Sequence, residues 1–228
     1  METFLLYNRW LHIAAGFIGF FVAPLALYVR KGGVAHRWWG KVFFWAMLVA
    51  GSTALAAAML KGMTFLLLTG VFSLYLAFFG YRSLYLKHLG AGQRPALLDW
   101  TLVGAGLLVF AGTLGYGLVA GNTPAAVFGA IGLMTTGRQL WSYVRTAPPK
   151  PEQWLLNHIS GFVGSYIAAV SAFSATSLHF IPWPWNFLWP TLLLVPPMVW
   201  VQRRYKARFA QGQRPADLVE VRIRPNTG

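Results

Sequence analysis

Histidine has the widest choice of chemistry in this chain, and there are five histidines. His12, His36 and His158 lie in or at the edge of long apolar stretches, whereas His88 and His179 fall where loops are expected. A neutral imidazole binds transition metals and haem iron, and it can also carry protons near neutral pH. We therefore predict His36 and His158 as ligands of a metal or a haem, with His12 as a further cofactor-binding candidate.

The spacing of these histidines decides which of them could share one centre. Two ligands of one metal lie within about 4 Å of each other, because each bond is about 2 Å long. His36 and His158 belong to the same end of their stretches, with depths that differ by several ångström at about 1.5 Å per helical residue. Helix tilt could close that gap. His12 lies near the opposite end and cannot join them. For all three, a hydrogen bond to a helix, loop or lipid headgroup is the alternative.

Arg138 is the candidate for binding an anion. At about 1.5 Å per residue it lies about 21 Å along a helix from Pro124, with Thr135, Thr136 and Gln139 beside it. Its guanidinium could hold a haem propionate, a quinone oxygen or a substrate carboxylate. The alternative is that the side chain extends to the headgroups of a membrane surface.

Composition excludes several other chemistries. The chain has no cysteine, which rules out disulfides, iron–sulfur clusters, thiolate-ligated haem and cysteine zinc sites. Of the five Asp and Glu residues none lies inside an apolar stretch, although Asp99 and Glu152 lie at the start of one. A membrane metal hydrolase using His12 or His158 would therefore lack a general base. We predict no catalytic residue.

Long stretches without Asp, Glu, Lys or Arg must position these side chains. They cover residues 10–29, 42–60, 62–81, 100–137 and 153–202. About 20 apolar residues cross a bilayer core about 30 Å thick. The first three stretches are one span each, and the last two are two spans each, broken at 121–124 and at 179–186. The sequence predicts an all-α bundle of seven transmembrane helices over 1–203 and a basic tail over 204–228.

The positive charge sets the expected orientation of these spans. Of the 19 Lys and Arg residues, 17 fall in alternate connections and in the tail, and only Arg9 and Lys61 fall on the other side. Because cytoplasmic loops carry the Lys and Arg excess, the N-terminus is expected outside and the C-terminus inside. The net charge of +14 then comes from cytoplasmic segments that face the anionic lipids of a bacterial inner membrane. We therefore do not expect nucleic acid as a partner.

A short repeat suggests internal duplication. Residues 92–96 and 212–216 have the same sequence, Gly-Gln-Arg-Pro-Ala, at an offset of 120. The same offset brings the first three spans onto the last three and places His36 close to His158. We therefore expect two parallel three-helix halves joined by the fourth span, an arrangement known in transporters.

Several motifs support a family resemblance. They are His12 to Gly16, Ala23-Pro24, Lys31 to Gly33, His36-Arg37, Gly40 to Phe43, Asn157-His158 and Ser165 to Ala168. At these residues the chain resembles a bacterial family of multi-pass membrane proteins classified as a domain of unknown function. The histidine spacing is also similar to that of b-type membrane cytochromes. The chain lacks the two histidine pairs of the di-haem pattern, so this second resemblance implies at most one haem.

Three functions follow from these patterns. The first is an inner-membrane protein with a histidine-ligated cofactor, a single b-type haem or a transition metal, for electron transfer or cofactor handling. A quinone or a redox protein would be its partner in that case. The second is a small-molecule transporter with its site between the two halves. The third is a non-catalytic assembly subunit of a membrane complex.

Overall fold

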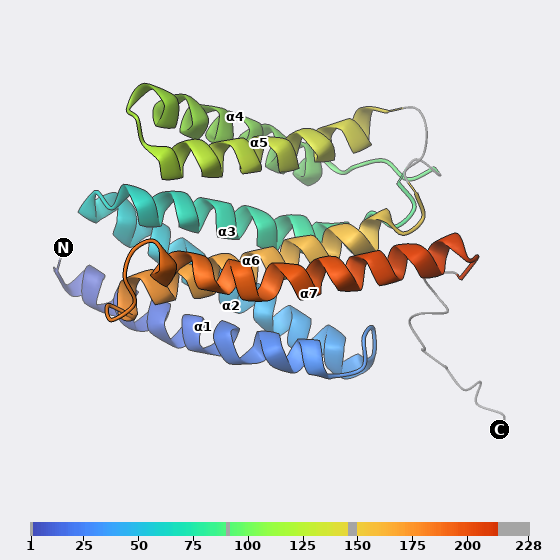
Figure 1. The fold of residues 1–228 in the computed structure, drawn as a ribbon, viewed down its shortest axis with the longest axis horizontal. Helices are drawn as coiled ribbons and strands as arrows, with labels where there is room; N and C mark the ends of the chain where they lie inside the picture. Colours follow the sequence, from blue (N-terminus) through green and yellow to red (C-terminus); the bar gives the residue numbers. More distant parts are fainter. Residues whose placement is uncertain (1, 90–91, 146–149, 214–228) are drawn as a thin grey trace.

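Seven helices make up the part of the chain that the computed structural model describes, residues 2–89, 92–145 and 150–213 (Figure 1). The helices are α1 (Glu2–Tyr28), α2 (Val34–Lys61), α3 (Thr64–Ser83), α4 (Leu97–Val119), α5 (Thr123–Val144), α6 (Gln153–Ser177) and α7 (Trp185–Ala210). They run alternately in opposite directions along the long axis, so α1 begins at one end of the molecule and α7 finishes at the other.

Both breaks predicted within the longer apolar stretches are turns between helices. In the first, Gly121 has a φ of 63°, a left-handed conformation that glycine adopts without strain. The next residue, Asn122, caps α5 by accepting a hydrogen bond of 3.0 Å from the N–H of Ala125. The second break separates α6 from α7. The described residues therefore form seven helices, as predicted, whereas the prediction that all seven cross a membrane stays a prediction.

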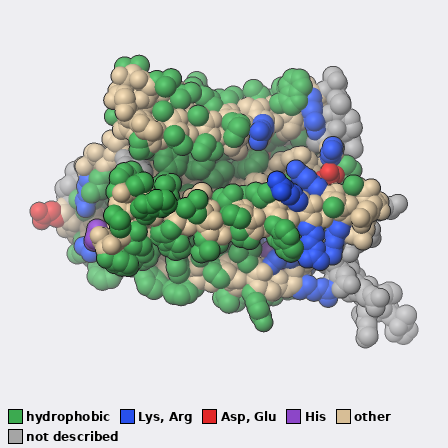
Figure 2. Space-filling view, in the orientation of Figure 1, with side chains coloured by type: hydrophobic (Ala, Val, Ile, Leu, Met, Phe, Trp, Pro, Cys, Tyr) green, Lys and Arg blue, Asp and Glu red, His purple; other side chains and the backbone are tan. Residues whose placement is uncertain are grey.

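The surface of the molecule is that of a multi-pass membrane protein. Five helices, α1, α2, α3, α4 and α6, are long and apolar enough to cross a bilayer. Large apolar side chains point outward, with exposed fractions of 60% for Phe17 and 78% for Leu108. Figure 2 shows hydrophobic side chains over the middle of one face and most Lys and Arg side chains gathered at one end. Apolar surface on this scale marks a contact with membrane or protein and is not typical of water-facing monomers.

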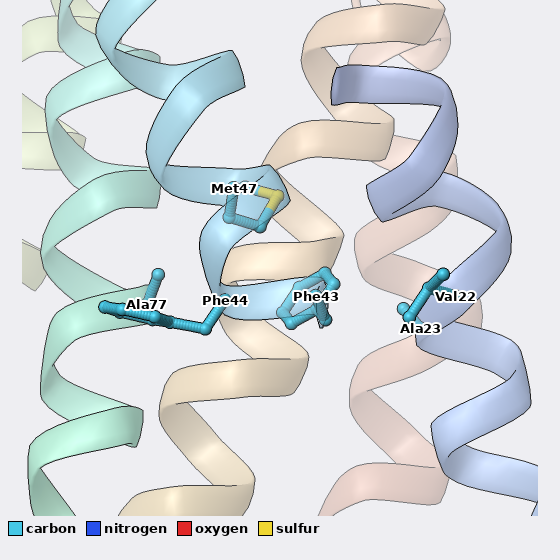
Figure 3. Close-up of a cluster of buried hydrophobic side chains, with 6 residues drawn as sticks. All are labelled: Val22, Ala23, Phe43, Phe44, Met47 and Ala77. Atoms are coloured by element: carbon cyan, nitrogen blue, oxygen red, sulfur yellow. The ribbon is translucent and has the colours of Figure 1, made fainter. Parts of the chain in front are cut away.

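The main core lies where α1, α2 and α3 meet (Figure 3). Its buried residues are Val22 and Ala23 of α1, Phe43, Phe44 and Met47 of α2, and Ala77 of α3. Phe44 stacks on Tyr81 of α3 with ring centroids 4.1 Å apart, and Phe43 packs on Phe162 of α6 at 5.4 Å. Aromatic contacts therefore tie α2 both to α3 and to α6.

Gly80 of α3 and Gly161 of α6 bring the backbones of these two helices into contact. A Cβ atom placed on Gly161 would lie 2.4 Å from both the Cα and the nitrogen of Gly80. A Cβ atom on Gly80 would lie 2.8 Å from the backbone nitrogen of Phe162. Only hydrogen side chains allow the two backbones to touch in this way, as small residues do at other helix crossings in membranes.

The helices α4 and α5 form a hairpin whose main support is α3. Gly117 of α4 and Gly129 of α5 bring the two backbones together, since a Cβ atom on either would overlap the backbone of the other helix. At the basic end Arg82 of α3 forms a bidentate ion pair with the fully buried Asp99 of α4, at 2.7 and 2.9 Å. Sequence analysis had placed Asp99 at a helix start without a partner.

The two copies of the repeated motif begin with the same turn. Gly92 and Gly212 both have positive φ values, 91° and 83°. The following glutamines, Gln93 and Gln213, each donate their backbone N–H to the carbonyl five residues earlier. Residues 214–216 lie outside the described residues. If the halves were duplicated, α5 and α6 would correspond to α1 and α2. However, α1 packs along α2, whereas α5 packs along α4. Duplication of the halves stays a prediction.

The glycine contact between α3 and α6 generates a stability prediction. We expect Gly161→Ala to lower the free energy of unfolding by about 1–3 kcal/mol, the usual cost of overpacking, because backbone atoms of Gly80 cannot move aside. The measurement is thermal unfolding in detergent followed by circular dichroism. Gly137→Ala is the matched control, since a Cβ atom there meets nothing within 4 Å. Equal stability of the two variants would contradict the prediction.

Candidate functional site

His36 and His158 come together at the basic end of the bundle. His36 lies in the first turn of α2, and His158 lies in the second turn of α6. Their ring centroids are 6.3 Å apart, and the ring planes are nearly perpendicular at 82°. The two histidines that sequence analysis selected for one centre are therefore neighbours in the bundle.

The ring of His36 is held by the end of α1. Its Nδ1 lies 2.9 Å from the carbonyl oxygen of Ala26, one of the last four carbonyls of that helix, which lack partners within a helix. The Lys31 ammonium also donates to a carbonyl of this turn, that of Leu27. Burial lowers the pKa of Lys31, which lies between the two helices. The short connection from α1 to α2 thus fixes the His36 ring.

The ring of His158 is held in the same way by the end of α3. Its Nδ1 lies 3.1 Å from the carbonyl oxygen of Gly80, which is again one of the last four carbonyls of a helix. The last turn of α3 closes through the N–H of Leu84 and the carbonyl of Tyr81. The backbone contact of Gly80 with Gly161 brings the Gly80 carbonyl within reach of His158.

These two hydrogen bonds determine which ring nitrogen is free. A carbonyl oxygen only accepts, so the Nδ1 of each histidine carries the proton and donates it. The lone pair then lies on Nε2, and among the described residues no hydrogen bond reaches the Nε2 atom of His36 or of His158. Histidines that bind metals almost always donate their other N–H to a carbonyl or carboxylate in this manner.

The separation of the two rings limits how they could bind one ion. A metal–nitrogen bond of about 2 Å, plus about 1 Å from that nitrogen to the ring centre, allows two centroids up to about 6 Å apart. The observed 6.3 Å is slightly longer than this limit, which holds for a linear arrangement of the two nitrogens and the metal. The two rings would therefore have to move closer together to bind one ion.

A haem fits this packing less well than a bare ion. The Phe162 ring lies 4.7 Å from the ring of His158, and Phe43 packs behind it. On the same side Gly80 and Gly161 are already in backbone contact. A macrocycle between the two histidines would have to separate α3 from α6. The packing around the pair therefore does not fit a haem.

A bound ion would need further ligands beyond the His, Cys, Asp and Glu side chains of the described residues. Among the described residues no group of three or more His, Cys, Asp or Glu side chains could hold a metal. An ion on His36 and His158 would keep open coordination positions, as metals do where they exchange ligands or react.

The remaining candidate residues lie away from the pair. The Nδ1 of His12 lies 2.9 Å from the carbonyl oxygen of Ala50 and 3.3 Å from the hydroxyl of Thr53, both on α2. Arg138 is exposed on α5 and makes no hydrogen bond or ion pair with another described residue. The structure brings neither residue to His36 and His158. His88 and His179 lie in connections between helices, as expected.

A hydrogen bond from Tyr166 attaches α6 to α1. Pro24 has no N–H, so the carbonyl of Phe20 four residues earlier lacks its helical donor. The Tyr166 hydroxyl donates to this carbonyl at 3.3 Å. Sequence analysis included Ala23-Pro24 and Tyr166 among the motif residues but had no means of pairing them.

The chain was compared with protein-family models, with curated proteins and with solved structures, and none of the three comparisons found a match. The resemblance to an uncharacterised membrane family stays a prediction.

The bond between Tyr166 and Phe20 can be tested with a double-mutant cycle. We expect Tyr166→Phe to lower the free energy of unfolding by about 1 kcal/mol, because it removes one hydrogen bond. In a Pro24→Ala background the alanine N–H can bond the Phe20 carbonyl, so the same substitution should cost close to nothing. Unfolding in detergent measures both values. Equal costs in the two backgrounds would show that the carbonyl freed by Pro24 is not what Tyr166 binds.

Proposed function

We propose that this protein is a seven-span protein of the bacterial inner membrane that binds a transition-metal ion at its cytoplasmic end, through the Nε2 atoms of His36 and His158. One observation carries the proposal: the two rings are adjacent, and each donates its Nδ1 proton to a helix-terminal carbonyl. Imidazole ligands suit zinc, copper, iron and nickel, so the residues do not select one of these.

The cytoplasmic position is supported by the charge distribution. The connections beside the pair belong to the end of the molecule where most Lys and Arg side chains gather in Figure 2. Cytoplasmic segments carry this excess, so the same end faces the cytoplasm in the proposed orientation. Metal ions would then reach the pair from the cytoplasm.

The chemistry of the pair favours metal handling. Two protein ligands leave most coordination positions open, so an ion can be taken from one carrier and passed to another without dismantling a closed site. Among the described residues no Asp or Glu forms a three-ligand group with the two rings, so the pair lacks a carboxylate general base for hydrolysis.

A transporter is the second candidate, and one observation favours it. The hydroxyls of Ser165 and Ser171 are buried on α6 and have no partner among the described residues. Buried hydroxyls are nearly always hydrogen-bonded, so these two are candidates to contact a passing solute or water. Uptake into proteoliposomes that is lost in Ser165→Ala, with metal binding unchanged, would support this candidate over metal handling.

Metal binding is the direct test of the proposal. We expect the purified chain to take up one zinc or copper ion, measured by elemental analysis after equilibration and removal of excess ion. His36→Ala and His158→Ala should each weaken metal binding by at least about a hundredfold. Loss of a residue that only supports a ligand already costs up to about a hundredfold, and these variants remove a ligand itself. A visible absorption spectrum of the oxidised and the reduced sample identifies a haem if one is present.

His12→Ala is the matched control for metal binding. It removes a histidine that also contacts a backbone carbonyl of a neighbouring helix but has no second histidine beside it. Metal binding should be unchanged in this variant. The proposal is wrong if the wild-type chain binds no metal in stoichiometric amount, or if all three variants bind equally well.

The proposed orientation can be measured directly because the chain has no cysteine. Met63, between α2 and α3, and Leu97, at the start of α4, are 45% and 79% exposed at opposite ends of the bundle. In intact cells a membrane-impermeant maleimide should label Met63→Cys, with Leu97→Cys labelled only after the inner membrane is opened. The reverse pattern would place the histidine pair outside.

A further inference from the structure

The outward face of α5 combines an apolar stripe with two arginines at its cytoplasmic end. Residues that follow one another at steps of three or four share one face of a helix. The residues on this face, named here the α5 stripe, are Val127, Ile131, Met134, Arg138, Trp141 and Arg145. The four apolar side chains are between 41% and 65% exposed, Arg138 is exposed and Arg145 is half-buried.

The α5 stripe points away from the bundle, toward the acyl chains of a bilayer. The opposite face of α5 is occupied, since Thr136 and Gln139 are buried and Gly132 lies against the ring of Phe110 of α4. The helix α5 packs along α4, which is one of the five helices apolar enough to cross a bilayer. Figure 2 shows the α4–α5 hairpin covered by hydrophobic side chains, with basic ones toward the basic end. The stripe thus borders on lipid.

The two arginines lack a counter-charge. Among the described residues neither guanidinium forms an ion pair or a hydrogen bond, and the buried Nε of Arg145 has no acceptor. Asp99 is already paired with Arg82, and Glu152 forms no ion pair with either arginine. A charged side chain that borders on lipid is costly unless it is paired or reaches the headgroups. The stripe therefore calls for an anion that the lipid itself supplies.

The spacing of the arginines suits one phosphate group. At about 1.5 Å per residue, Arg138 and Arg145 begin about 10 Å apart along the helix, with Trp141 between them. Both side chains are long and flexible, so their guanidinium groups can meet beside the indole. A guanidinium binds two phosphate oxygens at once through its planar fork. Tryptophan is enriched at the level of the headgroups, which is also the level of the phosphate.

We infer that the α5 stripe binds one anionic phospholipid, with its phosphate between Arg138 and Arg145 and an acyl chain along the apolar part of the stripe. Charge complementarity sets the class of lipid. A zwitterionic headgroup brings its own ammonium to the two arginines, and like charges repel. The inference goes beyond the proposed metal site and does not rest on it, because α5 contributes neither of the two histidines.

The test is native mass spectrometry of the full chain in mild detergent. The probes are phosphatidylglycerol and phosphatidylethanolamine with the same acyl chains. We expect one phosphatidylglycerol per chain to bind more tightly than phosphatidylethanolamine. Arg138→Gln should weaken phosphatidylglycerol binding by at least about tenfold, because it removes charge-assisted hydrogen bonds. Arg138→Lys should keep part of the affinity, since lysine retains the charge without the fork.

Arg9→Gln is the matched control. It removes the same charge from an exposed arginine of α1 at the opposite end of the bundle, so lipid binding should be unchanged. Equal weakening in Arg9→Gln and Arg138→Gln would overturn the inference, because the net charge alone would then attract the lipid. His36→Ala should bind phosphatidylglycerol as the wild type does, so the outcome is separate from that of the metal experiment.

Other occupants of the stripe give different results. Displacement of the lipid by an equal concentration of inorganic phosphate would overturn the inference, because the acyl chain would then contribute nothing. A dimer that Arg138→Gln dissociates would assign the stripe to a second copy of the chain and overturn it as well. So would a wild type that binds both lipids equally. If Arg138→Gln does not fold, Arg145→Gln tests the same phosphate contact.

Discussion

The backbone contact between Gly80 and Gly161 is the constraint on which the rest of this structure depends. It sets how closely α3 and α6 approach, since any larger side chain at either position would overlap the other backbone. The same contact determines the depth at which α6 passes the end of α3. Because His158 lies one turn before Gly161, the contact delivers its ring to the Gly80 carbonyl and to the ring of His36.

A common physical rule explains the polar contacts around this crossing. In an apolar environment each backbone carbonyl needs a donor, and helix ends or prolines leave some carbonyls without one. His36 and His158 donate hydrogen bonds to carbonyls at the ends of α1 and α3, and Tyr166 donates one to the carbonyl that Pro24 leaves free. Each of these side chains stabilises the bundle, and in the histidines the remaining ring nitrogen is left with a directed lone pair.

Sequence alone predicts the helices well because long charge-free stretches and turn residues are local signals. The turn at Gly121 and Asn122 and the number of helices follow directly from such signals. The pairing of His36 with His158 was a hypothesis from residue type and position, and its geometry depends on a helix crossing that no local pattern encodes. The ion pair of Arg82 with Asp99 was missed for the same reason, since it joins two helices across a connection.

The position of Arg138 shows that residue type alone does not predict which way a side chain points. An arginine in an apolar stretch is a candidate for binding an anion, but its direction depends on the helix face that packs. Gln139 is buried and bonded on the inner face of α5, and its neighbour Arg138 is consequently turned outward. Sequence analysis named Gln139 only as a neighbour of Arg138 and had no means of pairing it with Tyr75 and Tyr143.

The attachment of the α4–α5 hairpin has a mechanical consequence. The hairpin is held to α3 by the buried ion pair near one end of that helix and, further along it, by the Tyr75–Gln139 bond and the contact of Phe72 with Phe128. These attachments use side chains of α3, whereas α6 is seated on the backbone of Gly80. Weakening the ion pair would therefore loosen the hairpin and leave the crossing of α3 with α6 in place.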